Sequence, residues 1–546
     1  MSTIEPWQLI AAEKRSLRDQ ALMPYFADDV HLRTERVRNV AGRSRIEPQT
    51  AQSITELDSI EELHARLSRG DYTAEDVTLA YIKRATIAHQ VTNAITEVIF
   101  EDAIKQARAL DETFKQTKKT KGPLHGIPVT LKDQFNVKGY DTTLGYVGRS
   151  FSPATEDATL VQILKNLGAI VIAKTNLPQS IMWCETDNPL FGLTVNPRDS
   201  KFTPGGSTGG ESALLALQAS ILGFGTDIGG SVRIPQHMAG LYGLKPSSAR
   251  LPYHGVPVST EGQEHVPSSV GPMARSLSST IYISKLLANS RPWTRDPRCA
   301  PLPWRDELFQ DPQSRPLVIG LILDDGVVKP HPPITRALLQ LSAALRAAGH
   351  EVVPWSTEGH HECIEIMDAF YTVDGGEDIR RGVLAGGEPF IPHVEKLVNR
   401  GQPISVYEYW QLNKRKFAAQ KRYLDQWNAA VGPETGRVVD VLLAPTMPHV
   451  AVPHRCCRWV GYTKVWNFLD YTALTLPAGE VCEEDRIDGV PHKPRNELDE
   501  WNWGLYDLET MKGHPVNLQI VGRKLEEEKV LGAAVVIENI IHGLPN

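Results

Sequence analysis

Hydrophobic residues in this chain of 546 residues recur with helical spacing in some segments and in short uninterrupted runs in others. Residues 159–176, TLVQILKNLGAIVIAKTN, predict a helix, a stop at Gly168 and then a buried strand. Residues 317–326, 337–355 and 438–448 show further helices or apolar strands of the same helix-and-strand pattern. Helices that alternate with apolar strands predict a large α/β protein built on one sheet.

The N-terminal third predicts further elements of both kinds. Between residues 59 and 90 the apolar positions follow helical spacing, and Thr73 with Asp76 predicts a helix start. The residues that set this spacing are Leu63, Leu67, Val77, Leu79 and Ile82. Residues 122–137, GPLHGIPVTLKDQFNV, predict a turn followed by a short apolar strand that ends at Lys132. Residues 1–60 are more charged and predict a partly helical N-terminal arm.

Composition narrows the class of protein. The chain has 58 basic and 65 acidic residues, so its net charge of −7 favours neither nucleic acid nor an anionic membrane as a partner. No apolar run approaches the roughly 18 residues that span a bilayer, and the first residues lack the apolar core of a signal peptide. Six cysteines in this length do not make a disulfide framework. We therefore expect a cytoplasmic protein without a transmembrane anchor.

Residues 203–235, TPGGSTGGESALLALQASILGFGTDIGGSVRIP, place two serines between glycines, Ser207 and Ser231. The spacing does not fit a dinucleotide-binding loop, and the stretch lacks the lysine of a phosphate-binding loop. Residues 205–209 match the Gly-x-Ser-x-Gly turn of α/β hydrolases, but a polar loop stands where that turn needs a strand. Thr208 and Glu211 have the spacing of a capping box at the start of a helix. None of these explains the second cluster, DIGGS.

A further interpretation treats both serines and a lysine as one catalytic unit. Burial at the end of the predicted strand would lower the pKa of Lys132 and leave a neutral amine that acts as a base. Ser207 would relay a proton between this amine and the nucleophile, Ser231. The backbone N–H groups from Ile228 through Gly229 and Gly230 to Ser231 would form an oxyanion hole.

At these residues the sequence resembles the amidase signature family, in particular its fungal acetamidase and general amidase branch, which is related to fatty acid amide hydrolase. The matching motifs are LKDQF around Lys132, PGGSTGGE around Ser207 and GTDIGGSVRIP around Ser231. The resemblance implies one α/β domain over residues 61–546, with a signature core of about 122–280 and a central mixed β-sheet covered by helices on both faces. This single domain replaces the three to four domains that length alone suggests.

The resemblance also implies roles for individual residues. Lys132, Ser207 and Ser231 would be the base, the shuttle and the acyl-enzyme nucleophile, and Ser207 would follow a cis peptide bond. Asp227 and Arg233 would be charges that support the site. Ile181, Met182 and Trp183 would shape the substrate pocket.

Four positions depart from the family's usual residues: Thr208, Ser212, Val232 and Asn517. We expect the methyl group of Thr208 to tighten the site and Asn517 to alter a pocket wall. Cys184 is expected to line the pocket. Residues 465–471 are expected either to pack in the core or to cover the mouth of the pocket. The HHEC and HRCC runs at 360–363 and 454–457 lack a second ligand pair, so we expect neither a metal nor a cofactor.

We therefore expect a serine amidohydrolase that acts on a small-molecule amide, with no nucleic-acid partner and with a homodimer left open. The alternatives are a glutaminase-like subunit that supplies ammonia, an acyl-transfer or ester-cleaving enzyme of a biosynthetic pathway, and a catalytically silent scaffold of the same fold.

Overall fold

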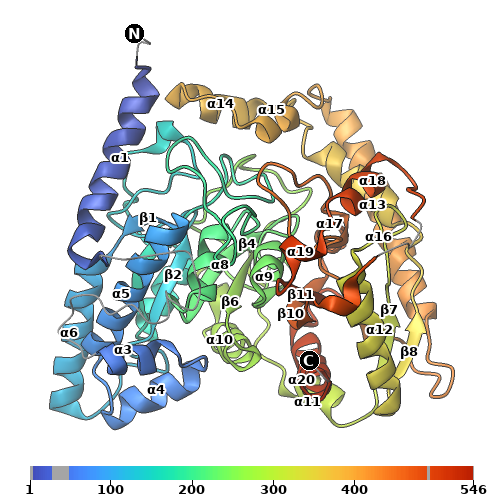
Figure 1. Cartoon of the computed structure of the whole chain (residues 1–546), viewed down its shortest axis with the longest axis horizontal. Helices are drawn as coiled ribbons and strands as arrows, with labels where there is room; N and C mark the ends of the chain where they lie inside the picture. Colours follow the sequence, from blue (N-terminus) through green and yellow to red (C-terminus); the bar gives the residue numbers. More distant parts are fainter. Residues whose placement is uncertain (1–3, 28–47, 488–491, 545–546) are drawn as a thin grey trace.

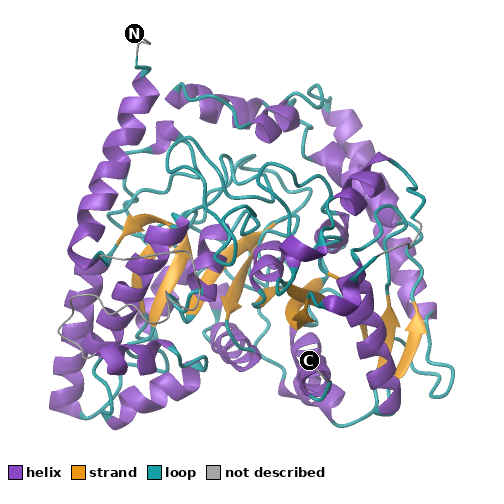
Figure 2. Ribbon diagram, viewed as in Figure 1, coloured by secondary structure: helices purple, strands orange, loops and turns teal. Residues whose placement is uncertain are grey.

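A computed structural model describes residues 4–27, 48–487 and 492–544 of the chain. Eleven strands form one sheet in the order β1-β3-β2-β4-β6-β5-β10-β11-β9-β7-β8, and helices surround it (Figures 1 and 2). The strands are β1 Ile95–Val98, β2 Pro128–Lys132, β3 Ile170–Thr175, β4 Leu222–Asp227, β5 Tyr242–Lys245, β6 Ser269–Ala274, β7 Val318–Leu321, β8 Glu351–Pro354, β9 Val441–Pro445, β10 Thr472–Glu480 and β11 Pro515–Gly522. The predicted α/β class with one mixed sheet is confirmed.

The sheet is mixed because two groups of parallel strands flank an antiparallel centre. Strand β2 runs parallel to β3 and β4, and β7 runs parallel to β8 and β9. The strands from β4 through β6, β5, β10 and β11 to β9 pair antiparallel. The carboxyl ends of β2 and β4 therefore meet at one edge of the sheet, where the chain continues into the candidate site.

The helices follow the predicted pattern in the segments that the sequence analysis identified. Their bounds are α1 Pro6–Leu22, α3 Pro48–Thr55, α4 Ile60–Arg69, α5 Ala74–Thr92, α6 Phe100–Thr117, α7 Thr159–Asn166, α8 Gly209–Ala216, α9 Arg233–Ala239, α10 Leu277–Asn289, α11 Asp306–Gln310, α12 Pro332–Ala347, α13 His360–Phe370, α14 Glu377–Gly386, α15 Pro392–Val398, α16 Val406–Ala429, α17 Gly461–Phe468, α18 Glu497–Gly504, α19 Leu508–Met511 and α20 Glu527–His542. Thr73 and Asp76 form the predicted capping box of α5, and Gly168 ends α7 with a φ of +100°.

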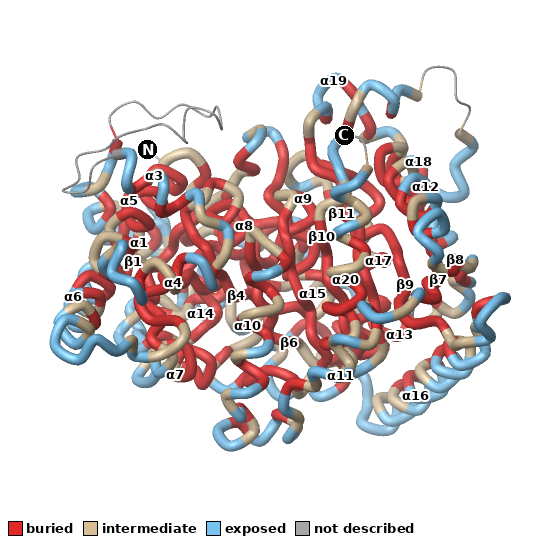
Figure 3. The backbone as a smooth tube through the Cα atoms, turned by 90° about the horizontal axis from the view of Figure 1, so that it is seen from below, coloured by how far each residue is buried: buried red, intermediate tan, exposed pale blue. Residues whose placement is uncertain are grey.

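Apolar side chains form three large core clusters along the sheet. One gathers around β1 to β4 and the N-terminal helices, the second around β7, β9, β10 and β11 with α12 and α20, and the third around α13, α16 and α17. Figure 3 shows the buried backbone running through the middle of the molecule, with exposed segments at its periphery. Val465, Trp466 and Phe468 belong to the third cluster, so residues 465–471 pack in the core as one of the two expectations had it.

Of the expected N-terminal arm, residues 1–60, the structure describes α1 and α3, whereas residues 28–47 lie outside the described residues. Helix α1 packs beside β1 through Lys14, whose ammonium group lies 2.6 Å from both Glu97 and Asp141. The proline-rich segment 291–316 contains only short helical turns and α11 between α10 and β7. No helix within the described ranges combines the length and hydropathy needed to cross a bilayer.

Candidate active site

Strand β2 buries Lys132 completely at its carboxyl end. The Lys132 Nζ atom donates to Ser207 Oγ at 2.7 Å and to Thr226 Oγ1 at 2.8 Å. Thr226 lies on the neighbouring parallel strand β4, and its hydroxyl in turn donates to Gln134 Oε1 at 2.7 Å. The structure thus brings the predicted lysine and the first predicted serine into direct contact.

The amine of Lys132 is held in a medium that disfavours its charged form. Burial lowers the pKa of Lys132 from 10.5 to about 7, although the carboxylates of Asp227 and Asp133 act in the opposite direction. A lysine on the protein surface is almost entirely protonated at neutral pH. At pH 7 a large fraction of the Lys132 amines is therefore neutral.

Ser207 is held in the turn that leads into α8. The Gly206–Ser207 peptide bond is cis, in agreement with what the family resemblance implies. A side chain at Gly206 would meet the backbone N and O of Glu185 at 2.5 Å, so this position requires glycine. Only 1% of Ser207 is exposed.

The predicted capping box of Thr208 and Glu211 is wrong. The Thr208 side chain does not cap α8, and its hydroxyl has no hydrogen-bond partner among the described residues. Glu211 is fully buried and instead accepts hydrogen bonds from Thr130 and Thr175. These two hydroxyls lie on β2 and β3 and compete successfully for the carboxyl group.

Ser231 lies in the loop between β4 and α9 and is half-buried. Its hydroxyl makes no hydrogen bond to any described residue, including Ser207, but both serines line the same small cavity together with Thr226 and Ile228. Ser231 also lines a larger cavity of about 510 Å³. It is therefore the member of the predicted triad that faces the space available to a ligand.

The loop before Ser231 has its carbonyl groups fixed by side chains. Tyr371 donates its hydroxyl to the Ile228 oxygen at 2.9 Å, and Thr463 donates to the Gly229 oxygen at 2.6 Å. The Gly230 N–H donates to Asp227 Oδ1 at 2.8 Å. Of the four N–H groups expected in an oxyanion hole, Gly230 is therefore already engaged, whereas those of Ile228, Gly229 and Ser231 have no partner among the described residues.

Asp227 and Arg233 form a buried ion pair beneath this loop. Arg233 donates from Nε to Asp227 Oδ2 and from Nη2 to Asp227 Oδ1, both at 3.0 Å. Burial alone would raise the pKa of the carboxyl group, but Arg233 and the other donors lower it to about 2. Asp227 also accepts a hydrogen bond from the Gly230 N–H. The Asp227–Arg233 ion pair therefore connects the loop before Ser231 to the start of α9.

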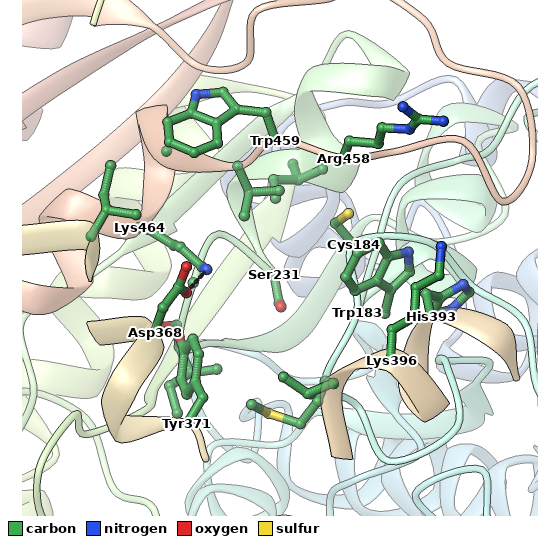
Figure 4. A pocket seen from close by; sticks show the side chains of 18 of the residues that line it. Trp183, Cys184, Ser231, Asp368, Tyr371, His393, Lys396, Arg458, Trp459 and Lys464 are labelled. Carbon is green, nitrogen blue, oxygen red and sulfur yellow. Dashed lines mark hydrogen bonds and ion pairs between the residues drawn. The ribbon is translucent and has the colours of Figure 1, made fainter. Parts of the chain in front are cut away.

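The larger cavity opens above Ser231, and Figure 4 shows the side chains around it. The predicted pocket residues Ile181, Met182 and Trp183 all line it, and so does Cys184. Trp183 stacks on His393 with ring centroids 4.6 Å apart. The cavity is therefore apolar near the serine.

The sequence analysis missed the residues that the C-terminal half of the chain contributes to this cavity. They include Asp368 and Tyr371 at α13, His393, Lys396, Leu397 and Arg400 at α15, and Arg458, Trp459 and Lys464 at α17. These residues follow Ser231 by more than 130 positions and form no local motif, so no pattern in the sequence links them to it.

The four departures lie at different places. Thr208 packs against β4, where a side chain on Gly225 would meet its methyl group. Ser212 donates to the Pro204 and Gly209 oxygens, and the Val232 N–H donates to Asp227. Asn517 is buried in β11, donates to the Gln236 and Leu241 oxygens and does not line the large cavity, so the expectation for this residue is wrong.

The histidines of the two candidate metal runs have other partners. His360 Nε2 is 2.9 Å from the Tyr423 hydroxyl, and His454 Nε2 is 2.9 Å from the Ser200 oxygen. Over residues 4–27, 48–487 and 492–544, no three His, Cys, Asp or Glu side chains are grouped so that they could hold a metal ion.

Comparison with known proteins identifies the family of this chain. The amidase family model matches residues 76–531, and the chain is an enzyme that belongs to this family. It is 52% identical to Amidase 1 of Gibberella moniliformis over 98% of this chain and 99% of that protein. It is 37% identical to the acetamidase of Emericella nidulans over 98% of both chains. A solved structure of fatty acid amide hydrolase superimposes with a TM-score of 0.87 at 30% identity, covering 98% of this chain and 95% of that one. The amidase signature resemblance is confirmed.

Proposed function

We propose that this amidase is a serine amidohydrolase in which Ser231 is the nucleophile, Ser207 the proton shuttle and Lys132 the base. One observation carries the proposal. The Lys132 amine, buried and with its pKa lowered to about 7, contacts the Ser207 hydroxyl at 2.7 Å, and Ser207 borders the same small cavity as Ser231.

The hydrogen bonds around Lys132 support the direction of proton transfer. The Thr226 hydroxyl has one proton, which it donates to Gln134, so it can only accept from Lys132. A neutral amine that gives an N–H to Thr226 can turn its lone pair toward Ser207. Ser207 can then donate to Lys132 and accept a proton from Ser231.

The reaction proceeds in two halves. Ser231 Oγ bonds to the amide carbonyl carbon while its proton moves to Ser207 and the Ser207 proton moves to Lys132. The C–N bond then breaks, and the leaving nitrogen takes the proton back through Ser207. A water molecule repeats these transfers on the acyl-enzyme and releases a carboxylic acid and free Ser231.

The oxygen of the tetrahedral intermediate needs hydrogen-bond donors near Ser231. The N–H groups of Ile228, Gly229 and Ser231 are the candidates, because none is engaged by a described residue. We leave Gly230 out of this set, since Asp227 holds its N–H. Such donors typically contribute a factor of about 10²–10³ in kcat each.

Turnover of the purified chain on acetamide, hexanamide, benzamide and long-chain amides tests the proposal. Ser231→Ala is expected to abolish hydrolysis, and Ser207→Ala to lower kcat by several orders of magnitude. Ser150→Ala, in a loop of the same chain outside the lining of both cavities, is the matched control.

Three outcomes would contradict the proposal. Activity on glutamine alone would favour an ammonia-supplying subunit, and acyl transfer or ester cleavage without amide hydrolysis would favour a biosynthetic enzyme. Failure of a fluorophosphonate to label Ser231 would favour a silent scaffold.

A further inference from the structure

The rim of the large cavity is lined by four cationic side chains and a single carboxylate among its described residues. The cations are Lys396, Arg400, Arg458 and Lys464, and the carboxylate is Asp368, so three positive charges are in excess. This local excess is opposite in sign to the net charge of −7 of the whole chain. The mouth of the cavity is therefore a positive patch on a negative protein.

Asp368 neutralises only one side of this rim. Its carboxylate forms an ion pair with Lys464 and lies 3.2 Å from Arg400. Figure 4 shows Asp368 and Lys464 together to the left of Ser231. On that side one carboxylate therefore faces two cations, and both of these cations are ion-paired.

Lys396 lies to the right of Ser231 in Figure 4, beside Trp183 and His393, and Arg458 lies at the upper right of the same view. Neither side chain forms an ion pair or a hydrogen bond with any residue that the structure describes. The Arg458 guanidinium only approaches the Trp501 ring, at 5.9 Å. Burial lowers the pKa of His393 to about 3, and the charges of Arg455 and Lys396 act in the same direction.

Apolar side chains also line this cavity, among them Met182, Trp183 and Leu397. A cavity of about 510 Å³ is in the range that takes a medium-sized ligand rather than one as small as acetamide. Such a site fits a molecule with a reactive group at one end, an apolar body and an anionic group at the other end.

We propose that Lys396 and Arg458 form a subsite for a carboxylate at the far end of the substrate, so that the preferred substrates are amides with an apolar body and a terminal carboxylate. This inference rests on the proposed amidohydrolase activity and deepens it. Arg458 offers a planar pair of donors that matches a carboxylate, and Lys396 adds a point charge. Neither residue takes part in bond making or breaking.

Six amides that differ only at the far end and in length test the proposal. Hexanamide, adipamic acid and 6-aminohexanamide end in a methyl group, a carboxylate and an ammonium group, and the corresponding ten-carbon amides extend the series. We expect kcat/KM to be at least tenfold higher for the carboxylate than for the methyl compound at one or both lengths, and lowest for the ammonium compound. Raising the salt to 0.5 M is expected to shrink these differences.

The variants Lys396→Gln and Arg458→Gln distinguish a loss of carboxylate binding from a loss of activity on all amides. Both side chains are exposed, so the variants are expected to fold. Each is expected to lower kcat/KM for the carboxylate compound about tenfold and to leave the methyl compound within twofold. Lys119→Gln, an exposed lysine beyond α6 at the other side of the molecule, makes the same change in net charge and is expected to alter nothing.

A bound amide is expected to protect Ser231 from fluorophosphonate labelling, so the extent of protection compares the binding of the carboxylate and methyl amides without measuring turnover. Stronger protection by the carboxylate amide, lost in Lys396→Gln, would support the subsite. Hydrolysis of the neutral amides with no advantage for the carboxylate would overturn the subsite but leave the proposed function intact. Absence of both hydrolysis and labelling would overturn the two proposals together.

Discussion

The carbonyl oxygen of Ile228 fixes the direction of the next N–H group in the chain. Because the two ends of a trans peptide unit point in opposite directions, the Tyr371 hydroxyl that holds this oxygen also turns the Gly229 N–H away from itself. A side chain at Gly229 would meet that same hydroxyl at 3.2 Å. Tyr371 is thus a positioning residue for the loop that precedes Ser231.

Tyr371→Phe removes this hydrogen bond and keeps the ring. We expect kcat to fall about tenfold, which is less than the loss of a whole oxyanion donor, while KM stays within twofold. Steady-state kinetics on an amide measures both constants. Tyr407→Phe, on the exposed face of α16, is the control. An unchanged kcat, or a change confined to KM, would show that Tyr371 does not position the loop.

At the residue scale the sequence predicts the centre of the site better than its walls. Lys132, Ser207 and Ser231 stand in local motifs, and the two serine motifs contain glycines that close packing requires, as the contact of Gly206 with Glu185 shows. Lys396 and Arg458 stand in segments without any such motif. Only tertiary packing brings α15 and the loop before α17 over Ser231, so no local pattern contains this information.

At the scale of elements, the parallel pairing of β2 with β4 places Lys132, the proposed base, beside Thr226. Both strands end at the same edge of the sheet, so Lys132 and Thr226 meet there. The sequence predicts β2, whereas β4 and its pairing with β2 are seen only in the structure. The capping box at Thr208 fails for a similar reason, since the hydroxyls of β2 and β3 that take Glu211 are distant in sequence.

Helix α1 is attached to the rest of the molecule through a buried ion pair. Lys14 lies between Glu97 and Asp141, and its removal would leave two carboxyl groups without a cation. We expect Lys14→Met to lower the free energy of unfolding by about 3 kcal/mol, as breaking a buried pair typically does. Burial raises the pKa of Glu97 to about 7 even with Lys14 present, so this group is expected to take up a proton in the variant.

Urea denaturation measures this effect. Lys105→Met, an exposed lysine on α6, is the control, and Glu97→Gln added to Lys14→Met is expected to recover part of the loss. Equal stability of Lys14→Met and the wild type would mean that α1 is held by its apolar contacts alone.

At the scale of the whole molecule, buried neutral histidines make the fold sensitive to acid. Burial lowers the pKa of six of the 17 histidines to about 3 or 4. They are His237, His265, His331, His360, His393 and His514. Between pH 6.5 and about 4 the unfolded chain therefore binds protons at these positions that the folded chain does not.

The sign of the effect follows from this difference in bound protons. Stability from these histidines is fully present above pH 6.5 and is lost as the pH falls toward 4. Six buried carboxyl groups with raised pKa values act in the opposite direction, namely Glu97, Glu185, Glu211, Asp325, Glu388 and Glu527. The histidines still outnumber them, because burial also lowers the pKa of His89 and His449 well below the usual value. We expect the urea midpoint to be lower at pH 5 than at pH 7.5, with net proton uptake on unfolding at pH 5.5. A midpoint that is equal or higher at pH 5 would contradict this expectation.

The central claim of the account is that a neutral Lys132 activates Ser231 through Ser207. The rate at which a fluorophosphonate labels Ser231, measured from pH 5 to 10, tests it most directly. In the wild type the rate is expected to rise with an apparent pKa near 7 and then level off, because deprotonation supplies the base. In Lys132→Met the rate is expected to be at least a hundredfold lower and to lose this rise. A rate that peaks below pH 6, or the same rise in Lys132→Met, would contradict the claim.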